Sequence, residues 1–240
     1  MALRSLLGEA SMQTVAVISR KGGAGKSTVA VNLAAALRDA GQRAILADAD
    51  PLRSSSEALR AHSLSVVETS ASKLFALVTA SRRSGCDMLV IDTPASPEAD
   101  IVAAIKVADL CLVVTRPTYL DLAAALKTVD LLRQLRAPGL ILLNQCPSPR
   151  QGHEPRVVSG TLEALRFAGV PVSPVALRVR QAYQGALSYG RGVTEWEPKG
   201  AAAAETRALA DLVRQRMRGE GQGLRPANDV ASGALFTVQT

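Results

Sequence analysis

The chain has 240 residues, 48% of them apolar and 20% charged, which is typical of a globular protein that buries a sizeable core. It contains no run of about 18 uncharged apolar residues, and its first residues lack a secretion-signal pattern, so we expect no transmembrane helix and a cytoplasmic location. The net charge of +7 fits an anionic partner without distinguishing nucleic acid, nucleotide or membrane surface.

Five apolar runs alternate with longer segments of helical character along the chain. The runs are apolar on both faces, which predicts strands of a buried parallel sheet at 14–19, 43–48, 87–92, 109–114 and 140–145. The longer segments predict helices at 27–40, 71–83, 97–108, 120–136 and 155–168. Gly41 stands where a left-handed residue would end the first helix, and Pro97 suits the first turn of the third.

This alternation predicts a single α/β domain, with a doubly wound, mainly parallel sheet and helices on both of its faces. We place the domain at residues 12–218. Residues 1–11 are interpreted as a peripheral extension, and residues 219–240 as a flexible tail because helical periodicity is lost and glycine becomes frequent.

The sulfur and imidazole side chains do not predict a metal site. Cys86, Cys111 and Cys146 are odd in number and widely spaced, which favours buried, reduced thiols over a disulfide framework. His62 and His153 are the only histidines, too few to favour zinc.

Ten residues, SRKGGAGKST, join the first predicted strand to the first predicted helix. A glycine loop in this position can wrap its amides around phosphate oxygens, and the helix amino end adds a partial positive charge. In this interpretation Lys26 reaches the β and γ phosphates, Ser27 binds Mg²⁺ and Thr28 approaches the α phosphate. The common pattern G-x-x-x-x-G-K-[ST] is incomplete, because Arg20 holds its first glycine position.

Acidic residues follow two of the predicted strands. Asp48 and Asp50 lie at the end of the second strand and Asp92 at the end of the third, so all three are expected at the carboxyl edge of the sheet. Each could instead cap a helix or form a turn. Their occurrence together with Lys26 and Ser27 favours a nucleotide site.

The run KGGAGKS resembles the deviant Walker A motif of the ParA/MinD family of P-loop ATPases. The resemblance implies that Lys21 reaches across a nucleotide-sandwich dimer to the partner's phosphates, much as an arginine finger does. ATP binding would then switch dimerisation. The implied nucleotide-binding residues of the loop are Lys21, Gly22, Gly23, Ala24, Gly25, Lys26, Ser27 and Thr28.

The resemblance also implies roles for the carboxylates. Asp50, in the motif DADP, would orient the attacking water and act with Lys21 and Lys26 in catalysis. Asp92 would hold the Mg²⁺ shell through water, and Asp48 would make an outer contact. The implied magnesium site therefore comprises Ser27, Asp50 and Asp92.

The sequence departs from the family after this motif. Family members often carry Gln after its proline, whereas Leu52 and Arg53 follow Pro51 here. The contacts of this switch region and the rate of hydrolysis are therefore left open.

The similarity extends over about residues 12–218. Pro117 and Asp121 match residues that line the dimer-facing nucleotide pocket, and residues 176–195 are similar to a late block of the family. Asn144 matches an asparagine that recognises adenine, although an Asx turn at a strand end would explain it too.

The family contains members that bind DNA and members that bind membranes, and the carboxyl-terminal sequence favours DNA. A helix at 201–218 places Leu209, Leu212, Val213 and Met217 away from an arginine stripe, and the tail ends in SGALFTVQT, which has no basic residue for a membrane anchor. The candidate DNA-backbone patch comprises Arg178, Arg180, Arg191, Arg207, Arg214 and Arg218. An ordinary solvated arginine face is the alternative.

The resemblance therefore implies a ParA-type partition ATPase, weak on its own and stimulated by a ParB-like or other adaptor protein. Its ATP-bound homodimer would bind nonspecific DNA, be released on hydrolysis, and position a plasmid, a chromosome region or a protein cluster. ATP and Mg²⁺ are the expected cofactors, and a nucleoid-associated location follows. The alternatives are a MinD-like membrane-associated regulator and, more remotely, a metabolic or metal-delivery enzyme.

Overall fold

The computed structural model describes residues 12–59 and 64–219. The predicted extension 1–11, the predicted tail beyond Gly219 and His62 lie outside these residues. The described chain forms one parallel sheet of six strands in the order β3-β2-β4-β1-β5-β6. The strands are β1 (Gln13–Ile18), β2 (Ala44–Asp48), β3 (Ser65–Glu68), β4 (Met88–Asp92), β5 (Leu110–Thr115) and β6 (Gly139–Leu143).

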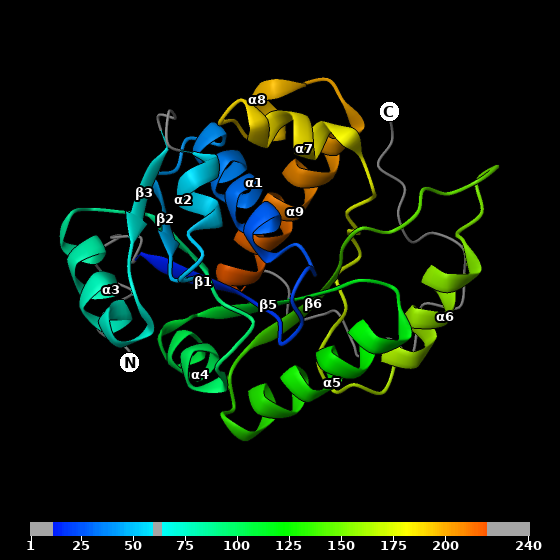
Figure 1. The fold of residues 1–240 in the computed structure, drawn as a ribbon, viewed down its shortest axis with the longest axis horizontal. Helices are drawn as coiled ribbons and strands as arrows, with labels where there is room; N and C mark the ends of the chain where they lie inside the picture. The colour runs from blue at the N-terminus through cyan, green and yellow to red at the C-terminus, as the bar shows by residue number, and fades with distance from the viewer. Residues whose placement is uncertain (1–11, 60–63, 220–240) are drawn as a thin grey trace.

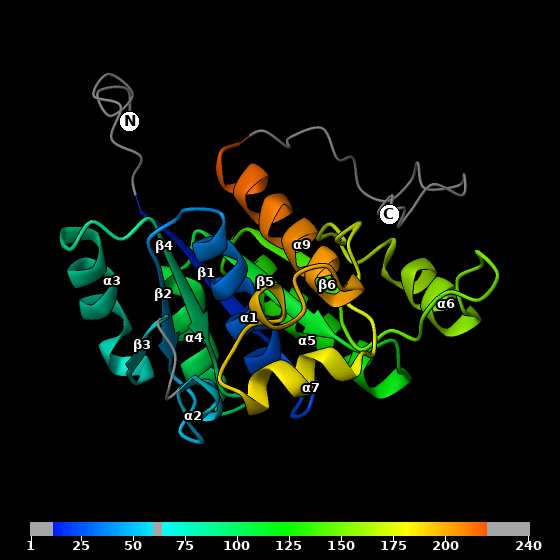
Figure 2. The same ribbon diagram turned by 90° about the horizontal axis from the view of Figure 1, so that it is seen from above.

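Helices cover both faces of the sheet, as the sequence predicts (Figure 1). The face that α1 (Lys26–Asp39) covers also carries α9 (Ala201–Met217), which packs against α1 (Figure 2). The helices that pack on the opposite face are α3 (Leu74–Arg83), α4 (Glu98–Val107), α5 (Tyr119–Gln134) and α6 (Arg156–Leu165). The shorter elements are α2 (Ser54–Ala58), a 3₁₀ turn η2 (Ala71–Lys73), α7 (Gln181–Ser188) and α8 (Val193–Trp196).

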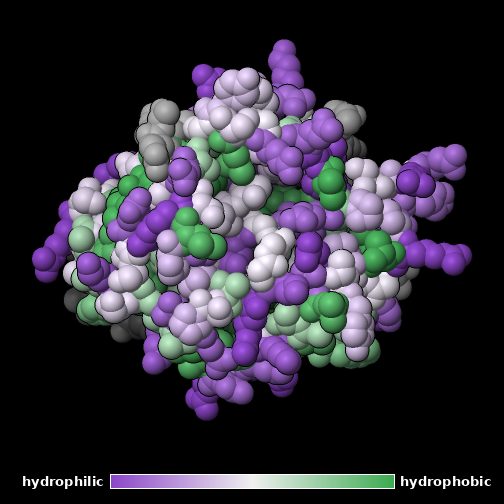
Figure 3. All heavy atoms as spheres, viewed as in Figure 1, coloured by the Kyte–Doolittle hydropathy of each residue, from purple (hydrophilic) through white to green (hydrophobic). Residues whose placement is uncertain are grey.

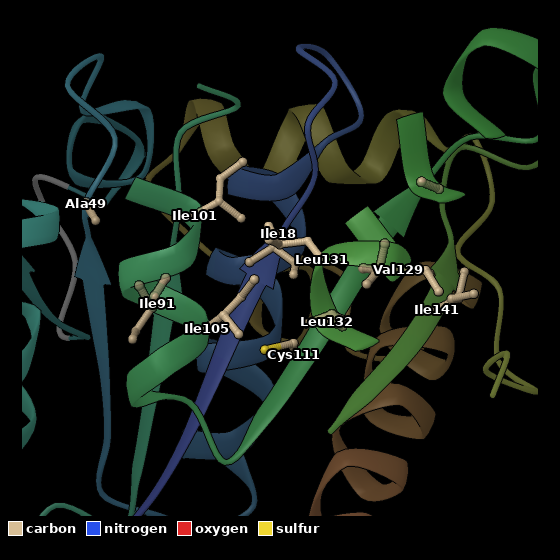
Figure 4. Close-up of a cluster of buried hydrophobic side chains, with 14 of the residues drawn as sticks. Ile18, Ala49, Ile91, Ile101, Ile105, Cys111, Val129, Leu131, Leu132 and Ile141 are labelled. Carbon is tan, nitrogen blue, oxygen red and sulfur yellow. The ribbon is translucent and has the colours of Figure 1, made fainter. Parts of the chain in front are cut away.

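The strands divide the core into two layers, because successive side chains of a strand point to opposite faces. Val15 and Val17 of β1 pack toward α1, whereas Ala16 and Ile18 pack in the layer under α4 and α5. Figure 4 shows the second layer, with Ile18, Ile91 and Ile105 among its members. Outside, hydrophilic side chains cover most of the face seen in Figure 3, with scattered apolar ones between them.

Five of the six strands coincide with the apolar runs, and β3 does not. It has four residues, and its end residues Ser65 and Glu68 are exposed at the sheet edge. A strand so short and half solvated lacks the continuous apolar pattern by which the others are predicted.

The ends of several helices also follow the sequence. Gly41 adopts the expected left-handed conformation, with φ of 84°, directly after the cap residue of α1. Pro97 precedes α4 as its cap instead of lying in its first turn. In α9 the expected faces are confirmed, since Leu209 and Val213 are buried and Arg207 is exposed.

The cysteines are buried and unpaired, as predicted, with Cys86 retaining 6% exposure and Cys111 and Cys146 none. Burial raises the pKa of both Cys111 and Cys146 to about 12. Among the helices of the described residues, none combines the length and apolar character needed to cross a bilayer.

Truncation of Leu112 should show how strongly the central strands stabilise the domain. This β5 residue is fully buried, so Leu112→Ala should lower the free energy of unfolding by about 2–5 kcal/mol through lost packing and the cavity left behind. Urea denaturation followed by circular dichroism measures this change. Phe75→Ala, at a side chain 75% exposed on α3, is the control and should change stability by less than about 0.5 kcal/mol. Equal effects would contradict this description of the core.

Candidate functional site

The glycine loop connects β1 to α1, as predicted, and leaves space for a ligand. Gly23 and Gly25 have φ of 76° and 89°, a region that only glycine adopts without strain. A Cβ added at Gly22 or Gly23 would meet nothing within 4 Å. No side chain of the described residues caps the amino end of α1, so its first amides remain available to an anion.

A cleft of about 530 Å³ opens beside this loop. It is bounded by the loop, the first turn of α1, the segment after β2 and the segment after β4. Its lining residues are Gly22, Gly23, Gly25, Lys26, Ser27, Thr28, Asp50, Pro51, Leu52, Ser54, Pro94, Ala95 and Ser96. The structure thus brings together most of the predicted loop residues and Asp50, while Ala24 is buried beneath them.

The strand register places two carboxylates side by side at the carboxyl ends of β2 and β4. Asp48 of β2 pairs with Asp92 of β4, and both are fully buried. The pKa of Asp92 is raised to about 6 by burial and by the Asp48 charge, while the Ser55 and Ser27 hydroxyls and the Lys26 ammonium oppose the rise.

The Asp92 carboxylate is only partly hydrogen-bonded. Its Oδ2 accepts a hydrogen bond from Ser55 Oγ at 2.6 Å, and its buried Oδ1 has no partner among the residues that the structure describes. A hard cation such as Mg²⁺ prefers oxygen ligands of this kind. The Asp92 carboxylate therefore fits its predicted place beside a metal ion.

Lys26 lies in the same charged group. Its side chain is buried, and this burial lowers the pKa of the ammonium, whereas Asp92 and Asp50 raise it. A phosphate in the cleft would add negative charge beside this lysine and stabilise its protonated form.

Asp48 has a structural role that the sequence did not specify. Its Oδ1 accepts from the Asp50 amide at 3.1 Å and its Oδ2 accepts from the Ser56 amide at 2.8 Å. These bonds shape the turn that carries Asp50, whose own Oδ1 accepts from the Leu52 amide at 2.9 Å. The turn thereby holds the Asp50 carboxylate at the wall of the cleft.

The two residues that depart from the family pattern point in different directions. Leu52 lines the cleft and is 78% exposed. Arg53 adopts a left-handed conformation, donates to the carbonyl of Asp48 and lies 3.7 Å from the Glu68 carboxylate of β3. Its guanidinium is therefore engaged with strands β2 and β3 instead of the cleft.

Asn144 braces the glycine loop. Its Nδ2 donates to the Ala24 carbonyl at 2.8 Å, and Gln145 Nε2 donates to the Gly23 carbonyl at 3.3 Å. The contact is tight, because a Cβ at Gly25 would lie 2.3 Å from Asn144 Nδ2. This role was not predicted, and the adenine contact of Asn144 stays a prediction.

The start of α5 faces the early lysine. Burial favours the neutral form of Asp121, but hydrogen bonds from Arg116 and Thr118 and the nearby charge of Lys21 outweigh it, so the pKa of Asp121 is lowered. Arg116 Nε donates to Asp121 Oδ1 at 2.9 Å. Pro117 between them is buried. Lys21 is thus electrostatically close to the segment expected to face a partner.

The arginines predicted to bind DNA do not form one free surface, and Arg178 requires a correction. Its side chain is only 5% exposed and forms an ion pair of 2.5 Å with Glu154, so it is not presented to DNA. The sequence missed this because the partner lies 24 residues away.

The other five arginines occupy varied settings. Arg180 pairs with Glu205 at 2.5 Å and Arg214 with Asp211 at 3.2 Å. Arg207 donates to the carbonyl of Pro198 at 2.7 Å. Arg191 and Arg218 are exposed, and their side chains form no ion pair or hydrogen bond with the described residues. Their contact with DNA remains a prediction.

Known proteins are similar to this chain in sequence and in fold. Residues 15–144 match the family model of the CobQ/CobB/MinD/ParA nucleotide binding domain. The chain is 33% identical over 204 residues to the maintenance of carboxysome distribution protein A of Gloeobacter kilaueensis, covering 80% of this chain and 89% of that protein. The protein of the same name from Halothiobacillus neapolitanus is 30% identical over 205 residues, covering 80% of this chain and 91% of its own.

Two solved structures illustrate the shared fold. MinD of Pyrococcus horikoshii, in complex with Mg-ADP, has a TM-score of 0.70 at 19% identity and covers 88% of this chain and 99% of its own. Apo McdA of Cyanothece has a TM-score of 0.71 at 15% identity and covers 84% and 99%. The chain therefore belongs to the CobQ/CobB/MinD/ParA family of nucleotide-binding domains, and the predicted fold and family are confirmed.

Substitution of Gly25 tests the brace between the loop and Asn144. Gly25→Ala forces a side chain into a left-handed conformation and against the Asn144 amide, so the nucleotide-free protein should lose about 1–3 kcal/mol of unfolding free energy. Gly22→Ala, where a Cβ meets nothing within 4 Å, should leave that value unchanged. Thermal and urea denaturation without nucleotide provide the measurement. Equal stability of the two variants would show that the brace does not constrain the loop.

Proposed function

We propose that this member of the CobQ/CobB/MinD/ParA family is a dimerising ATPase that positions a large protein assembly. In the proposed cycle the ATP-bound dimer binds DNA without sequence preference, and hydrolysis stimulated by an adaptor protein releases it. The observation that carries the proposal is the cleft that gathers the glycine loop, Lys26, Ser27 and Asp50 beside the buried Asp92. The two curated relatives are named for carboxysome distribution, which favours a protein cluster over a plasmid or a chromosome as cargo.

Binding of a triphosphate follows from the charges and amides around the loop. The amides from Lys21 to Thr28 and the first turn of α1 would surround the phosphate oxygens, and Lys26 would neutralise their charge from below. The low exposure of the Lys26 ammonium strengthens this attraction, because little solvent separates the charges.

Ser27, Asp50 and Asp92 would hold a magnesium ion at the phosphates. The orphaned Asp92 Oδ1 is the feature of the described site that fits the ion best. When bound, Mg²⁺ neutralises charge on the bridging and terminal phosphate oxygens. The ion would also favour the ionised form of Asp92, whose pKa burial raises to about 6.

We assign the orientation of the attacking water molecule to Asp50. It is partly exposed, lines the cleft and has one carboxylate oxygen fixed by the Leu52 amide. A fixed carboxylate can accept a hydrogen bond from water and hold it in line for attack on a phosphorus atom. Its anchoring through Asp48 and Ser56 keeps that direction constant.

The surface around the loop favours a second copy as the partner. Leu52, Tyr119 and Leu120 are 78%, 84% and 67% exposed, although all three carry large apolar groups. Tyr119 and Leu120 begin α5 next to Asp121, whose pKa the nearby Lys21 charge helps to lower. A second chain placed here would cover apolar surface and would bring its own Lys21 toward the phosphates.

Replacement of Asp50 tests hydrolysis. Asp50→Ala should bind ATP but hydrolyse it at least about 100-fold more slowly, because the water loses its orienting carboxylate, and the ATP-bound dimer should accumulate. Phosphate release and light scattering after size exclusion, each with ATP and Mg²⁺, report the two effects. Asp130→Ala removes an exposed carboxylate of α5 and is the control. Wild-type turnover by Asp50→Ala would remove Asp50 from this role.

Replacement of Lys21 tests the contribution of a second chain. Lys21→Ala should retain nucleotide binding while losing dimer-dependent turnover by roughly 10³-fold or more, the magnitude of a lost arginine finger. Turnover measured against protein concentration separates the dimer-dependent part. Arg20→Ala, which removes the neighbouring cation and its 2.5 Å ion pair with Glu98, is the matched control. Concentration-dependent turnover that survives in Lys21→Ala would contradict the proposed transfer of charge between chains.

A further inference from the structure

We infer that the connection between β6 and α6 contacts the phosphate backbone of duplex DNA, an inference that rests on the DNA binding proposed above. The connection narrows to a closed hairpin, in which the Arg150 amide donates to the His153 carbonyl at 3.0 Å and the His153 amide donates back at 2.9 Å. Gln151 and Gly152 form its tip with φ of 49° and 77°. Figures 1 and 2 show this segment projecting from the body of the molecule before α6.

The hairpin presents basic side chains around a hollow. Arg150, His153 and Arg156 are exposed and line a cavity of about 470 Å³ together with Pro147, Glu154 and Pro155. Hydrophilic side chains project from this edge of the molecule in Figure 3. Glu154 is the only acidic residue in the lining, and its carboxylate is already paired with Arg178 at 2.5 Å and 2.9 Å. The hollow is therefore suited to an anion.

Duplex backbone is the anionic partner that this chemistry favours. Guanidinium groups bind phosphate oxygens through paired hydrogen bonds, and such contacts carry no sequence information. The six lining residues include one aromatic ring, that of His153, which is too few for successive unpaired bases to stack on, and this disfavours single-stranded nucleic acid. They also offer no apolar anchor beyond two prolines for a folded protein partner.

Arg178 positions this hairpin instead of contacting DNA. Its NH1 donates to the Pro147 carbonyl at 3.0 Å as well as to Glu154, so it ties the outgoing and returning arms of the connection together. Its backbone amide donates to Glu205 of α9 at 3.1 Å. Arg178, which the sequence analysis assigned to DNA contact, therefore holds together the two arms of the hairpin that we propose contacts DNA.

The hairpin is also linked to the glycine loop. Asn144 and Gln145, which donate to the carbonyls of Ala24 and Gly23, stand directly before Cys146 and Pro147. A shift of the loop on nucleotide binding would pull on the same short segment that Arg178 holds from the other side. DNA contact at the hairpin is therefore expected to depend on whether a nucleotide is bound.

The test is DNA binding by the full chain with ATP and Mg²⁺ across a series of salt concentrations. Arg150→Glu combined with Arg156→Glu should make the slope of log affinity against log salt shallower by about 2 and weaken binding roughly 60-fold at 0.1 M salt, since two phosphate contacts are lost. Arg150→Gln with Arg156→Gln should give the same change in slope. Unchanged ATP affinity, measured by calorimetry, shows that the variants are folded.

A matched control carries the same change of charge elsewhere. Arg82→Glu combined with Arg83→Glu alters two exposed arginines of α3, at the end of the molecule opposite to α6 (Figure 1). This variant should keep the wild-type salt slope. An equal loss in both pairs would overturn the hairpin contact in favour of a general effect of net charge.

The remaining outcomes separate the inference from the function on which it rests. If the wild-type chain binds DNA and the hairpin variants bind it with the same affinity and salt slope, the inference alone is overturned. Wild-type chain that never retards DNA would overturn both. The wild-type chain could also bind vesicles of phosphatidylcholine and phosphatidylserine. If the hairpin variants lose this vesicle binding but retain DNA binding, the inference is overturned and this surface is assigned to a membrane.

Discussion

The parallel register of β1, β2 and β4 is the constraint on which the site depends. It aligns Val17, Asp48 and Asp92 at one edge of the sheet and buries two carboxylates next to each other. Such burial costs free energy, as the raised pKa of Asp92 shows. Lys26 offsets part of this cost, and a bound cation would offset more. The site is thus shaped for positive charge that the polypeptide alone does not fully supply.

A second constraint lies beside the glycine loop, where one short segment contacts the loop and continues into the hairpin. Asn144 and Gln145 hold the glycine loop, and the residues that follow form the hairpin fixed by Arg178 and Glu154. Side-chain hydrogen bonds connect this segment to the loop, and the peptide chain connects it to the hairpin. We propose that a change in the loop is transmitted to the hairpin along this segment.

Much of the fold follows from the sequence because its strands are apolar on both faces. That pattern predicted β1, β2, β4, β5 and β6, and the glycine run predicted the loop between β1 and α1. The edge strand β3 was missed since Ser65 and Glu68 face solvent. Glycine positions were predictable because their backbone requirements are local, as the φ angles of Gly23, Gly25 and Gly41 confirm.

Partners of charged side chains were not predictable in the same way. Ser55 meets Asp92 across 37 residues of sequence, and Arg178 meets Glu154 across 24. A pattern of charges along the chain does not reveal which carboxylate an arginine will face after folding. For this reason the sequence assigned Arg178 to an outer surface, and the braces at Asp48 and Asn144 emerged only from the structure.

Isothermal titration of the full chain with ATP, with and without magnesium, tests whether the cleft holds a nucleotide. One ATP should bind per chain when magnesium is present, and none should bind to a Lys26→Ala variant. Absence of any adenine-nucleotide binding by the wild-type chain with magnesium would contradict the proposed cycle, because the cleft would then hold no triphosphate to drive it.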